Sequence, residues 1–390
     1  MLVDDNWPRP DRDAGSIEIV NLAGTLRWLG FDVRMVVDES RSGLSAADAS
    51  SARDALRASG IVPMAFPDDV ALDAFLRGEG RSSQLVVLCR VFCGGGQFER
   101  VRRICSDARI VFNTIDLHYV RVAREAAMTG DPALETAAVT TRLREEFLAR
   151  EADATLVVSE KERETLEASV PQANVFALPL ARPLQPPVTP FAGRGGIGFI
   201  GGFAHAPNLD AVRFFLDQIW PLVLRDWPEC RFSIVGADLP AAVLDGRPGR
   251  VEYLGAVPDV GPWFESLLLT VAPLRFGAGV KGKVVSSLAA GVPCVTTGIA
   301  AEGMGLQDGV DSLLADDPSE IARHILHLRA DPALWARLSA GGMAHVAAAF
   351  SPDDWRARLR DALWTIDALP AGGPLAVPDL AHNGLGDSSR

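Results

Sequence analysis

One segment of the chain combines glycines with lysines where a strand is expected to pass into a helix. Residues 273–283 read Pro-Leu-Arg-Phe-Gly-Ala-Gly-Val-Lys-Gly-Lys. Glycines such as Gly277 and Gly279 let the backbone approach a ligand closely. A helix start offers free N–H groups at the positive end of its dipole. Lys281 and Lys283 add full charges, so the segment predicts a site for a diphosphate. A plain strand-to-helix turn with solvated lysines is the alternative.

A second glycine pair, Gly201-Gly202, follows another expected strand and precedes another expected helix. Its spacing lacks the third glycine of the dinucleotide-binding fingerprint. The pair therefore predicts either a tight turn beside a phosphate or a simple packing turn. His205, close behind it, could donate a hydrogen bond to a phosphate or cap the next helix.

Two segments of the first half carry polar residues directly after expected strands. Gly15 and Ser16 lie where a helix should begin, which suits an anion, sugar hydroxyls or an ordinary helix cap. Asp116 and His118 follow the expected strand 109–113, and could hydrogen-bond sugar hydroxyls or hold an acceptor. A lone Asp-x-His pair is a weak signal, and ordinary surface polarity is the simpler interpretation.

Neither the histidines nor the cysteines predict a metal site. His324 and His327 are spaced three apart on an expected helix, but no carboxylate or cysteine nearby completes a ligand set. The five cysteines are an odd number without paired metal spacing, which favours buried thiols. We expect neither a metal nor a cofactor.

Short apolar runs alternate with amphipathic runs in both halves of the chain, which predicts parallel sheets covered by helices on both faces. In the first half, strands are expected at 1–4, 31–37, 84–88, 109–113 and 154–159, with helices at 14–30 and 160–168. In the second half, strands are expected at 197–200, 231–235, 251–254, 268–272, 293–297 and 312–315, with helices at 208–225, 260–266, 280–290, 318–329 and 332–350. The fold class is therefore α/β, with two doubly wound, Rossmann-like domains. Ligands of such sheets bind beyond the carboxyl ends of the strands, so the cleft between the domains is the expected site.

A stretch dense in proline and glycine separates the halves. We predict an N-terminal domain at 1–180, a linker at 181–195 and a second domain at 196–350. An amphipathic helix follows at 351–369, and the tail at 370–390, rich in Pro, Gly, Asp and Ser, is expected to be disordered.

Length and charge limit the function. A chain of 390 residues is too long for one hydrophobic core. Its net charge of −12 would repel nucleic acid but leaves room for a local anion site. No apolar run approaches the roughly 18 residues of a membrane span, and the start lacks the features of a signal peptide. The expected location is the cytoplasm, with peripheral contact to the inner face of the membrane left open.

Five segments together resemble one enzyme family. Residues 277–297 resemble the signature of family 4 retaining glycosyltransferases, in the branch written G-A-G-x-K-x-K-x-x-E-x-x-A-x-G-x-P-x-V-x-T, and Glu302-Gly303 resembles the E-G that follows. The other segments are similar to that branch's G-x-F-x-H-x-P-N, P-x-P-D-x-x-A-G-S, V-D-L-H-x-x-R-x-x-R and V-V-S-E, found here at 201–208, 8–16, 115–124 and 157–160. The resemblance runs in matching order over residues 1–365.

This resemblance implies a GT-B fold, in which two Rossmann-like domains face each other and a C-terminal helix, here 351–369, crosses back to the first domain. Such enzymes move a sugar from a nucleoside diphosphate sugar to an acceptor hydroxyl, with retention and without a required metal, in glycan or glycoconjugate synthesis. The donor binds mostly to the second domain. The acceptor, which is a glycan, a lipid-linked sugar or a small molecule, binds to the first.

The resemblance also assigns roles to single residues. Lys281 would contact the donor diphosphate and His118, with Asp116, would lie near the transferred sugar. The remaining donor-binding residues would be Gly15, Gly201, Gly202, His205, Gly277, Gly279, Lys283, Ser286 and Glu302.

The chain departs from the family at a pair of glutamates spaced E-x7-E, of which the first touches the sugar and the second the ribose. Ala278 and Ser286 stand at these positions. A serine can hydrogen-bond ribose, but a neutral group holds it less strongly than a carboxylate does. This leaves two alternatives to a working transferase: a catalytically degenerate protein that binds a nucleotide sugar or glycan, and a GT-B sugar-nucleotide epimerase.

Overall fold

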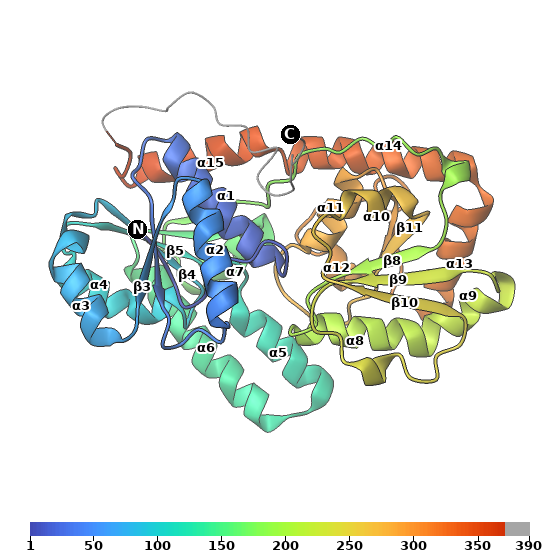
Figure 1. The fold of residues 1–390 in the computed structure, drawn as a ribbon, viewed down its shortest axis with the longest axis horizontal. Helices are drawn as coiled ribbons and strands as arrows, with labels where there is room; N and C mark the ends of the chain where they lie inside the picture. Colours follow the sequence, from blue (N-terminus) through green and yellow to red (C-terminus); the bar gives the residue numbers. More distant parts are fainter. Residues whose placement is uncertain (371–390) are drawn as a thin grey trace. The chain divides into compact units, whose positions relative to one another are not determined.

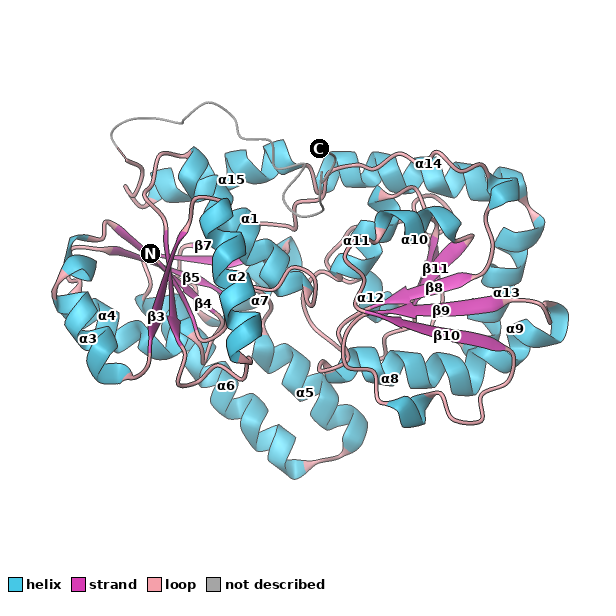
Figure 2. Ribbon diagram, in the orientation of Figure 1, coloured by secondary structure: helices cyan, strands magenta, loops and turns pink. Residues whose placement is uncertain are grey.

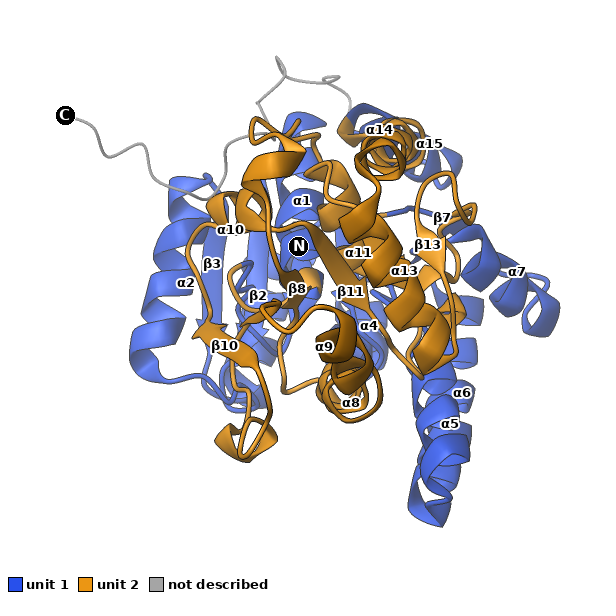
Figure 3. Ribbon diagram, turned by 90° about the vertical axis from the view of Figure 1, so that its right-hand side faces the viewer, with its two compact units in different colours: residues 1–10, 15–179, 353–383 blue, residues 11–14, 180–352, 384–390 orange. Residues whose placement is uncertain are grey.

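The computed structural model describes residues 1–370, so nearly all of the predicted disordered tail lies outside the described residues. The described chain forms two compact units (Figures 1 and 3). Unit 1 contains Met1–Pro10, Gly15–Pro179 and residues 353–370, and unit 2 contains Asp11–Ala14 and Leu180–Pro352. The assignment of acceptor and donor domains to these units stays a prediction.

Unit 1 is built on a parallel sheet of seven strands in the order β3-β2-β1-β4-β5-β6-β7. The strands are β1 (Leu2–Asp4), β2 (Arg34–Asp38), β3 (Val62–Phe66), β4 (Leu85–Cys89), β5 (Arg109–Asn113), β6 (Ala154–Val157) and β7 (Val175–Ala177). Strands β1, β4 and β6 are buried along their whole length, as expected for a sheet covered on both faces. The strand order reverses between β1 and β4, and loops beyond such a reversal are the usual ligand sites of open sheets.

Helices cover both faces of this sheet (Figure 2). They are α1 (Ala14–Trp28), α2 (Ala46–Ala58), α3 (Asp69–Arg77), α4 (Phe98–Ile104), α5 (His118–Thr129), α6 (Pro132–Glu151), α7 (Glu160–Ser169) and the C-terminal α15 (Pro352–Thr365). Side chains in the N-cap position fix several starts: Asp68, Asp131 and Ser159 accept backbone N–H bonds from the first turns of α3, α6 and α7.

Unit 2 repeats the architecture with six parallel strands in the order β10-β9-β8-β11-β12-β13. The strands are β8 (Ile197–Ile200), β9 (Arg231–Val235), β10 (Arg250–Gly255), β11 (Leu269–Ala272), β12 (Cys294–Thr296) and β13 (Leu313–Leu314). The helices are α8 (Ala206–Phe214), α9 (Trp220–Asp226), α10 (Gly261–Ser266), α11 (Gly282–Ala289), α12 (Gly298–Ala301), α13 (Pro318–Ala330) and α14 (Pro332–Ala349). The α/β fold class predicted from the sequence is confirmed.

Several predicted boundaries were wrong. The helix expected at 208–225 is interrupted by a π-helical segment, Phe215–Ile219, between α8 and α9. The helix expected at 280–290 begins only at Gly282, because Gly279 has a φ of 68° and Lys281 is extended. Strand β3 had no predicted counterpart, since it is half exposed and contains Pro63, as an edge strand can.

The segment predicted as a linker, 181–195, is anchored on unit 2. The backbone N–H groups of Val188 and Thr189 donate to the Glu265 carboxylate, at 3.0 and 2.8 Å. The Arg194 guanidinium, which is fully buried, pairs with the same carboxylate at 2.8 Å. Arg194 also donates to the carbonyl oxygens of Phe264 and Leu267, at 3.0 and 3.1 Å. The segment is therefore held along much of its length.

Candidate functional site

The lysine-bearing segment lies between β11 and α11, and we call residues 273–283 the glycine–lysine loop. The Thr297 hydroxyl donates to the carbonyl oxygen of Leu274 at 2.6 Å, which fixes the loop where it leaves the sheet. Gly277 has a φ of 142°, a conformation that other residues rarely adopt. A Cβ atom on Gly277 would lie 3.2 Å from Cε of Lys281. Glycine at 277 therefore makes room for the lysine side chain as well as for the turn.

Lys281 is the N-cap residue of α11 and is nearly buried, with 9% of its surface exposed. Its side chain does not cap the helix. Nζ instead turns back and donates to the carbonyl oxygens of Ala278 and Gly279, at 2.9 and 2.5 Å. No acidic residue occupies the first turn of α11, so the positive end of the helix carries a second cation rather than a counter-ion.

That second cation is Lys283, one residue into the helix. Its ammonium donates to Oδ1 of Asn208 and lies 4.8 Å from the centroid of the Phe199 ring. Desolvation, with the neighbouring Lys281 cation as the second cause, lowers the pKa of Lys283 from 10.5 to about 7. An anion bound here would raise this pKa again by stabilising the charged ammonium.

Asn208 connects the glycine–lysine loop to the glycine pair. Its Nδ2 donates to the carbonyl oxygen of Gly202 at 2.7 Å, while its Oδ1 accepts from Lys283. A Cβ atom on Gly201 would lie 2.8 Å from Nδ2 of Asn208, and one on Gly202 would lie 2.9 Å from the carbonyl oxygen of Arg12. Both glycines are therefore required by close approach. The two glycine segments singled out in the sequence lie together.

The other predicted donor-binding residues lie in helices or at their ends. His205 is exposed and is the N-cap residue of α8, but its side chain makes no capping hydrogen bond. Ser286, in the second turn of α11, accepts a hydrogen bond from Nε of the buried Arg182 at 3.3 Å. Glu302 follows α12 and is partly exposed. Gly15 is the second residue of α1 in unit 1 and is partly exposed.

Asp116 and His118 lie in unit 1, in a tightly held turn after β5. Ile115 has a φ of 67°, an unusual conformation for a β-branched residue. Nδ1 of His118 is 3.5 Å from Oδ1 of Asp116. Nε of Arg121 donates to the other oxygen of Asp116 at 3.0 Å. The structure therefore brings these two residues together, as the sequence suggested, and adds an arginine to them.

Two buried carboxylates bind the backbone of the same turn. Glu162 accepts from the N–H of Leu117 at 3.0 Å, and Glu145 accepts from the N–H groups of His118 and Tyr119 at 2.9 and 3.0 Å. The sequence analysis missed Glu145, Glu162, Asn208 and Arg182. Asn208 ends the G-x-F-x-H-x-P-N segment, so that motif was a usable signal. Glu145 has no local signal, because its partners are backbone groups 26 and 27 residues away.

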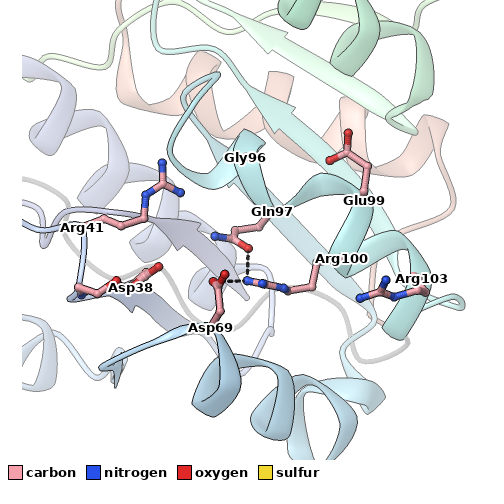
Figure 4. A pocket seen from close by; sticks show the side chains of 9 residues that line it. Asp38, Arg41, Asp69, Gly96, Gln97, Glu99, Arg100 and Arg103 are labelled. Atoms are coloured by element: carbon pink, nitrogen blue, oxygen red, sulfur yellow. Dashed lines mark hydrogen bonds and ion pairs between the residues drawn. The ribbon is translucent and has the colours of Figure 1, made fainter.

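A separate polar hollow of about 560 Å³ lies in unit 1 (Figure 4). Its charges are largely matched to each other. Arg100 donates to Asp69 and to the side-chain oxygen of Gln97, both at 2.6 Å, and Arg41 pairs with Asp5 at 3.1 Å. None of the site residues predicted from the sequence lines this hollow.

Residues 1–370 contain no cluster of three or more histidine, cysteine, aspartate or glutamate side chains suited to a metal ion. In the same part of the chain, every helix is too short or too polar to cross a membrane.

Residues 194–331 match the model of the family described as glycosyl transferases group 1. The matched segment is about a third of the chain. It includes both glycine segments, Asn208 and the two lysines, whereas the turn that holds Asp116 and His118 lies outside it.

Two curated bacterial proteins are similar in sequence. The lipopolysaccharide core biosynthesis mannosyltransferase LpcC of Rhizobium leguminosarum bv. viciae is 27% identical over 219 residues, which are 53% of this chain and 62% of that protein. An uncharacterised protein of the cps region of Klebsiella pneumoniae is 24% identical over 138 residues, or 33% of this chain and 36% of that protein. The match spans about three fifths of the mannosyltransferase and about a third of the Klebsiella protein.

Solved structures resemble nearly the whole chain. Sucrose-phosphate synthase from Thermosynechococcus elongatus superposes with a TM-score of 0.71 at 14% identity, covering 95% of this chain and 98% of that one. HepE from Anabaena, solved in complex with UDP-glucose, gives a TM-score of 0.67 at 13% identity, covering 93% and 98%. The chain has the GT-B fold, as the sequence resemblance implied.

Proposed function

We propose that this chain is a glycosyltransferase that moves a sugar from a nucleoside diphosphate sugar to an acceptor hydroxyl, with retention and without a required metal, in the synthesis of a surface glycan or glycoconjugate. The family match over residues 194–331, a relative named as a lipopolysaccharide core mannosyltransferase and the resemblance to a UDP-glucose complex support this proposal. The acceptor belongs to the class of glycans, lipid-linked sugars or small hydroxylated molecules.

The glycine–lysine loop is the observation that carries the proposal. Two lysines and an uncapped helix start converge within one short segment. When a glycosidic bond to a diphosphate breaks, negative charge grows on the leaving β-phosphate. Cations and N–H groups placed there stabilise the transition state more than the bound substrate. Lys281 would exchange the carbonyl oxygens of Ala278 and Gly279 for phosphate oxygens on binding.

His118 and Asp116 would act on the sugar in this proposal. An imidazole 3.5 Å from a carboxylate can donate to a sugar hydroxyl while the carboxylate holds the ring orientation. Ser286, with Arg182 behind it, would bind the ribose in place of the carboxylate that the family carries.

A thermal-shift screen tests donor binding directly. We expect one nucleotide among UDP, GDP, ADP, CDP and dTDP, with its sugar derivatives, to raise the melting temperature. A ligand at 100 times its Kd adds about 2.7 kcal/mol, which such a screen detects readily. The absence of a shift with every nucleotide would argue against a functional donor site.

Substitution of Lys281 tests the chemistry. Lys281→Ala should lower kcat by about 10²–10³-fold, because it removes a charge aimed at the leaving group. Lys161→Ala is the matched control, since Lys161 is exposed on α7 in unit 1. Transfer rates are measured with the nucleotide sugar that gives the largest thermal shift. Equal rates in the two variants would remove Lys281 from the mechanism.

One observation favours a second candidate, a degenerate protein that binds a nucleotide sugar without turning it over. Ala278 and Ser286 offer no carboxylate, and the Ser286 hydroxyl already accepts from Arg182. A thermal shift with a sugar nucleotide, but no nucleotide release with any acceptor, would support this candidate over the transferase.

A further inference from the structure

The first turn of α5 is capped from another helix. Its N-cap residue is Leu117, which has no side chain able to accept a hydrogen bond, and no side-chain cap is formed. Glu145, on α6, supplies both acceptors: Oε1 takes the N–H of His118 at 2.9 Å and Oε2 takes the N–H of Tyr119 at 3.0 Å. Two of the four N–H groups that a helix start leaves unpaired are thereby satisfied by one distant carboxylate.

The backbone just before this turn is strained. Ile115 holds its left-handed conformation between β5 and Asp116, and a conformation of this kind costs on the order of 1–3 kcal/mol. Such strain persists only where the surroundings fix the chain. Glu162 fixes it at Leu117, and Glu145 fixes it at the next two residues.

Capping a helix with a buried carboxyl group costs desolvation free energy. The Glu145 side chain is fully buried, and desolvation raises its pKa to about 8 against the opposing effect of the two N–H donors. A serine, threonine or aspartate at position 117 would cap the helix without burying an ionisable group. The arrangement therefore supplies something beyond helix stability, namely a fixed link between α6 and the residue that begins α5.

We propose that Glu145 is a positioning residue for His118. By binding the His118 and Tyr119 amides, it sets where the first turn of α5 starts and so where the imidazole lies, with Nδ1 3.5 Å from Asp116 and 3.9 Å from Glu145 itself. This inference rests on the proposed function for the meaning of His118 in catalysis, but the positioning itself is independent of it.

The positioning is tested by amide hydrogen exchange, resolved by residue with NMR, in Glu145→Gln. Glutamine keeps the size of the side chain but turns one acceptor into a donor, so one of the two amides loses its bond. We expect the His118 or Tyr119 amide to exchange at least about tenfold faster, while amides in the middle of α5 change little. Glu146→Gln, on the same helix and paired with Arg142 instead, is the matched control and should leave both amides unchanged.

The effect of Glu145 on catalysis is tested by a double-mutant cycle of Glu145 and His118. The sugar nucleotides UDP-glucose, GDP-mannose, ADP-glucose and dTDP-glucose serve as donor probes. Glu145→Gln should lower kcat for nucleotide release by about 10–100-fold with KM for the donor nearly unchanged, because a misplacement of about 1 Å can cost about 100-fold. In a His118→Ala background the same change should cost less than about twofold, since its effect passes through His118.

The outcomes distinguish a failure of the role given to Glu145 from a failure of the proposed function. Equal losses of rate in the presence and absence of His118, or unchanged exchange of both amides, would overturn the role of Glu145. Inactivity of the parent protein with all four sugar nucleotides would count against the proposed function and leave the exchange experiment decisive for Glu145. If Glu145→Gln does not fold, Glu145→Asp, which keeps the carboxyl group and shortens the reach, should give the same rate loss and the same exposed amides.

Discussion

Lysine is scarce in this chain and concentrated at one place. The sequence has three lysines among its 38 basic residues, and Lys281 and Lys283 are two of them. Ammonium groups respond to burial by losing their proton far more readily than guanidinium groups do. Nearly all other basic residues of the chain are arginines. The two lysines therefore make the glycine–lysine loop the place where a positive charge responds most readily to burial.

The lowered pKa of Lys283 predicts how donor binding depends on pH. Because the ammonium is lost as the pH rises through about 7, the affinity for the sugar nucleotide that gives the largest thermal shift should weaken between pH 7 and 9, by at most about tenfold per unit. Calorimetric titration at several pH values measures this. Lys283→Arg keeps its charge throughout and should bind with a nearly flat profile. A wild-type profile as flat as that of the arginine variant would contradict the prediction.

The sign is opposite for the protein without ligand. The unfolded chain keeps the Lys283 proton up to about pH 10.5, whereas the folded chain releases it near 7. The unfolded state therefore binds more protons across that window, and this residue makes the folded state more stable as the pH rises.

At the scale of elements, Arg194 is the anchor of the segment that leads into unit 2. Its guanidinium is enclosed by Glu265, three backbone carbonyl groups and the Trp335 ring, 5.2 Å away. Arg194→Leu should lower the free energy of unfolding by roughly 3–5 kcal/mol, because Glu265 loses its partner and the carbonyl groups lose their donors. Urea denaturation measures the loss.

Arg225→Leu is the control for that experiment. Arg225 is 72% exposed and pairs with its neighbour Asp226 on the surface. No measurable destabilisation is expected, since exposed pairs of this kind contribute little. Losses of equal size in both variants would show that the enclosure of Arg194 has no special role.

Much of the element order followed from apolar periodicity, and the failures have physical causes. Strands such as β8 and β9 were predicted at their exact bounds because they are short, apolar and bounded by turn residues. Helices α5 and α6 were missed because their exposed faces interrupt the apolar pattern. Lys281, Lys283 and the glycine pair were singled out because glycines and lysines at strand-to-helix turns form a local pattern, and their role in binding phosphate stays a prediction. Glu145 was not, since a carboxylate that binds backbone N–H groups leaves none.

At the scale of the whole molecule, two compact units predict two unfolding steps. Each unit has its own sheet and its own buried core, so scanning calorimetry should resolve more than one transition. The glycine–lysine loop belongs to unit 2. A bound sugar nucleotide should therefore raise the transition of that unit most, and Lys281→Ala should reduce the shift. One transition that moves as a whole would contradict independent unfolding.

The π-helical turn between α8 and α9 has a consequence for how this molecule tolerates changes in length. Hydrogen bonds spaced five residues apart accommodate one residue more than a regular helix would. Deleting a single residue from Phe215–Ile219 would restore a regular helix and leave α8 and α9 nearly in their present phase. Deleting a residue from the regular part of α8 would instead rotate the turns before it by about 100° and, with α9 fixed in the core by Trp220, carry Asn208 away from Lys283. The wide turn thus absorbs a change of length that the rest of the helix would pass on to the residue joining the two glycine segments.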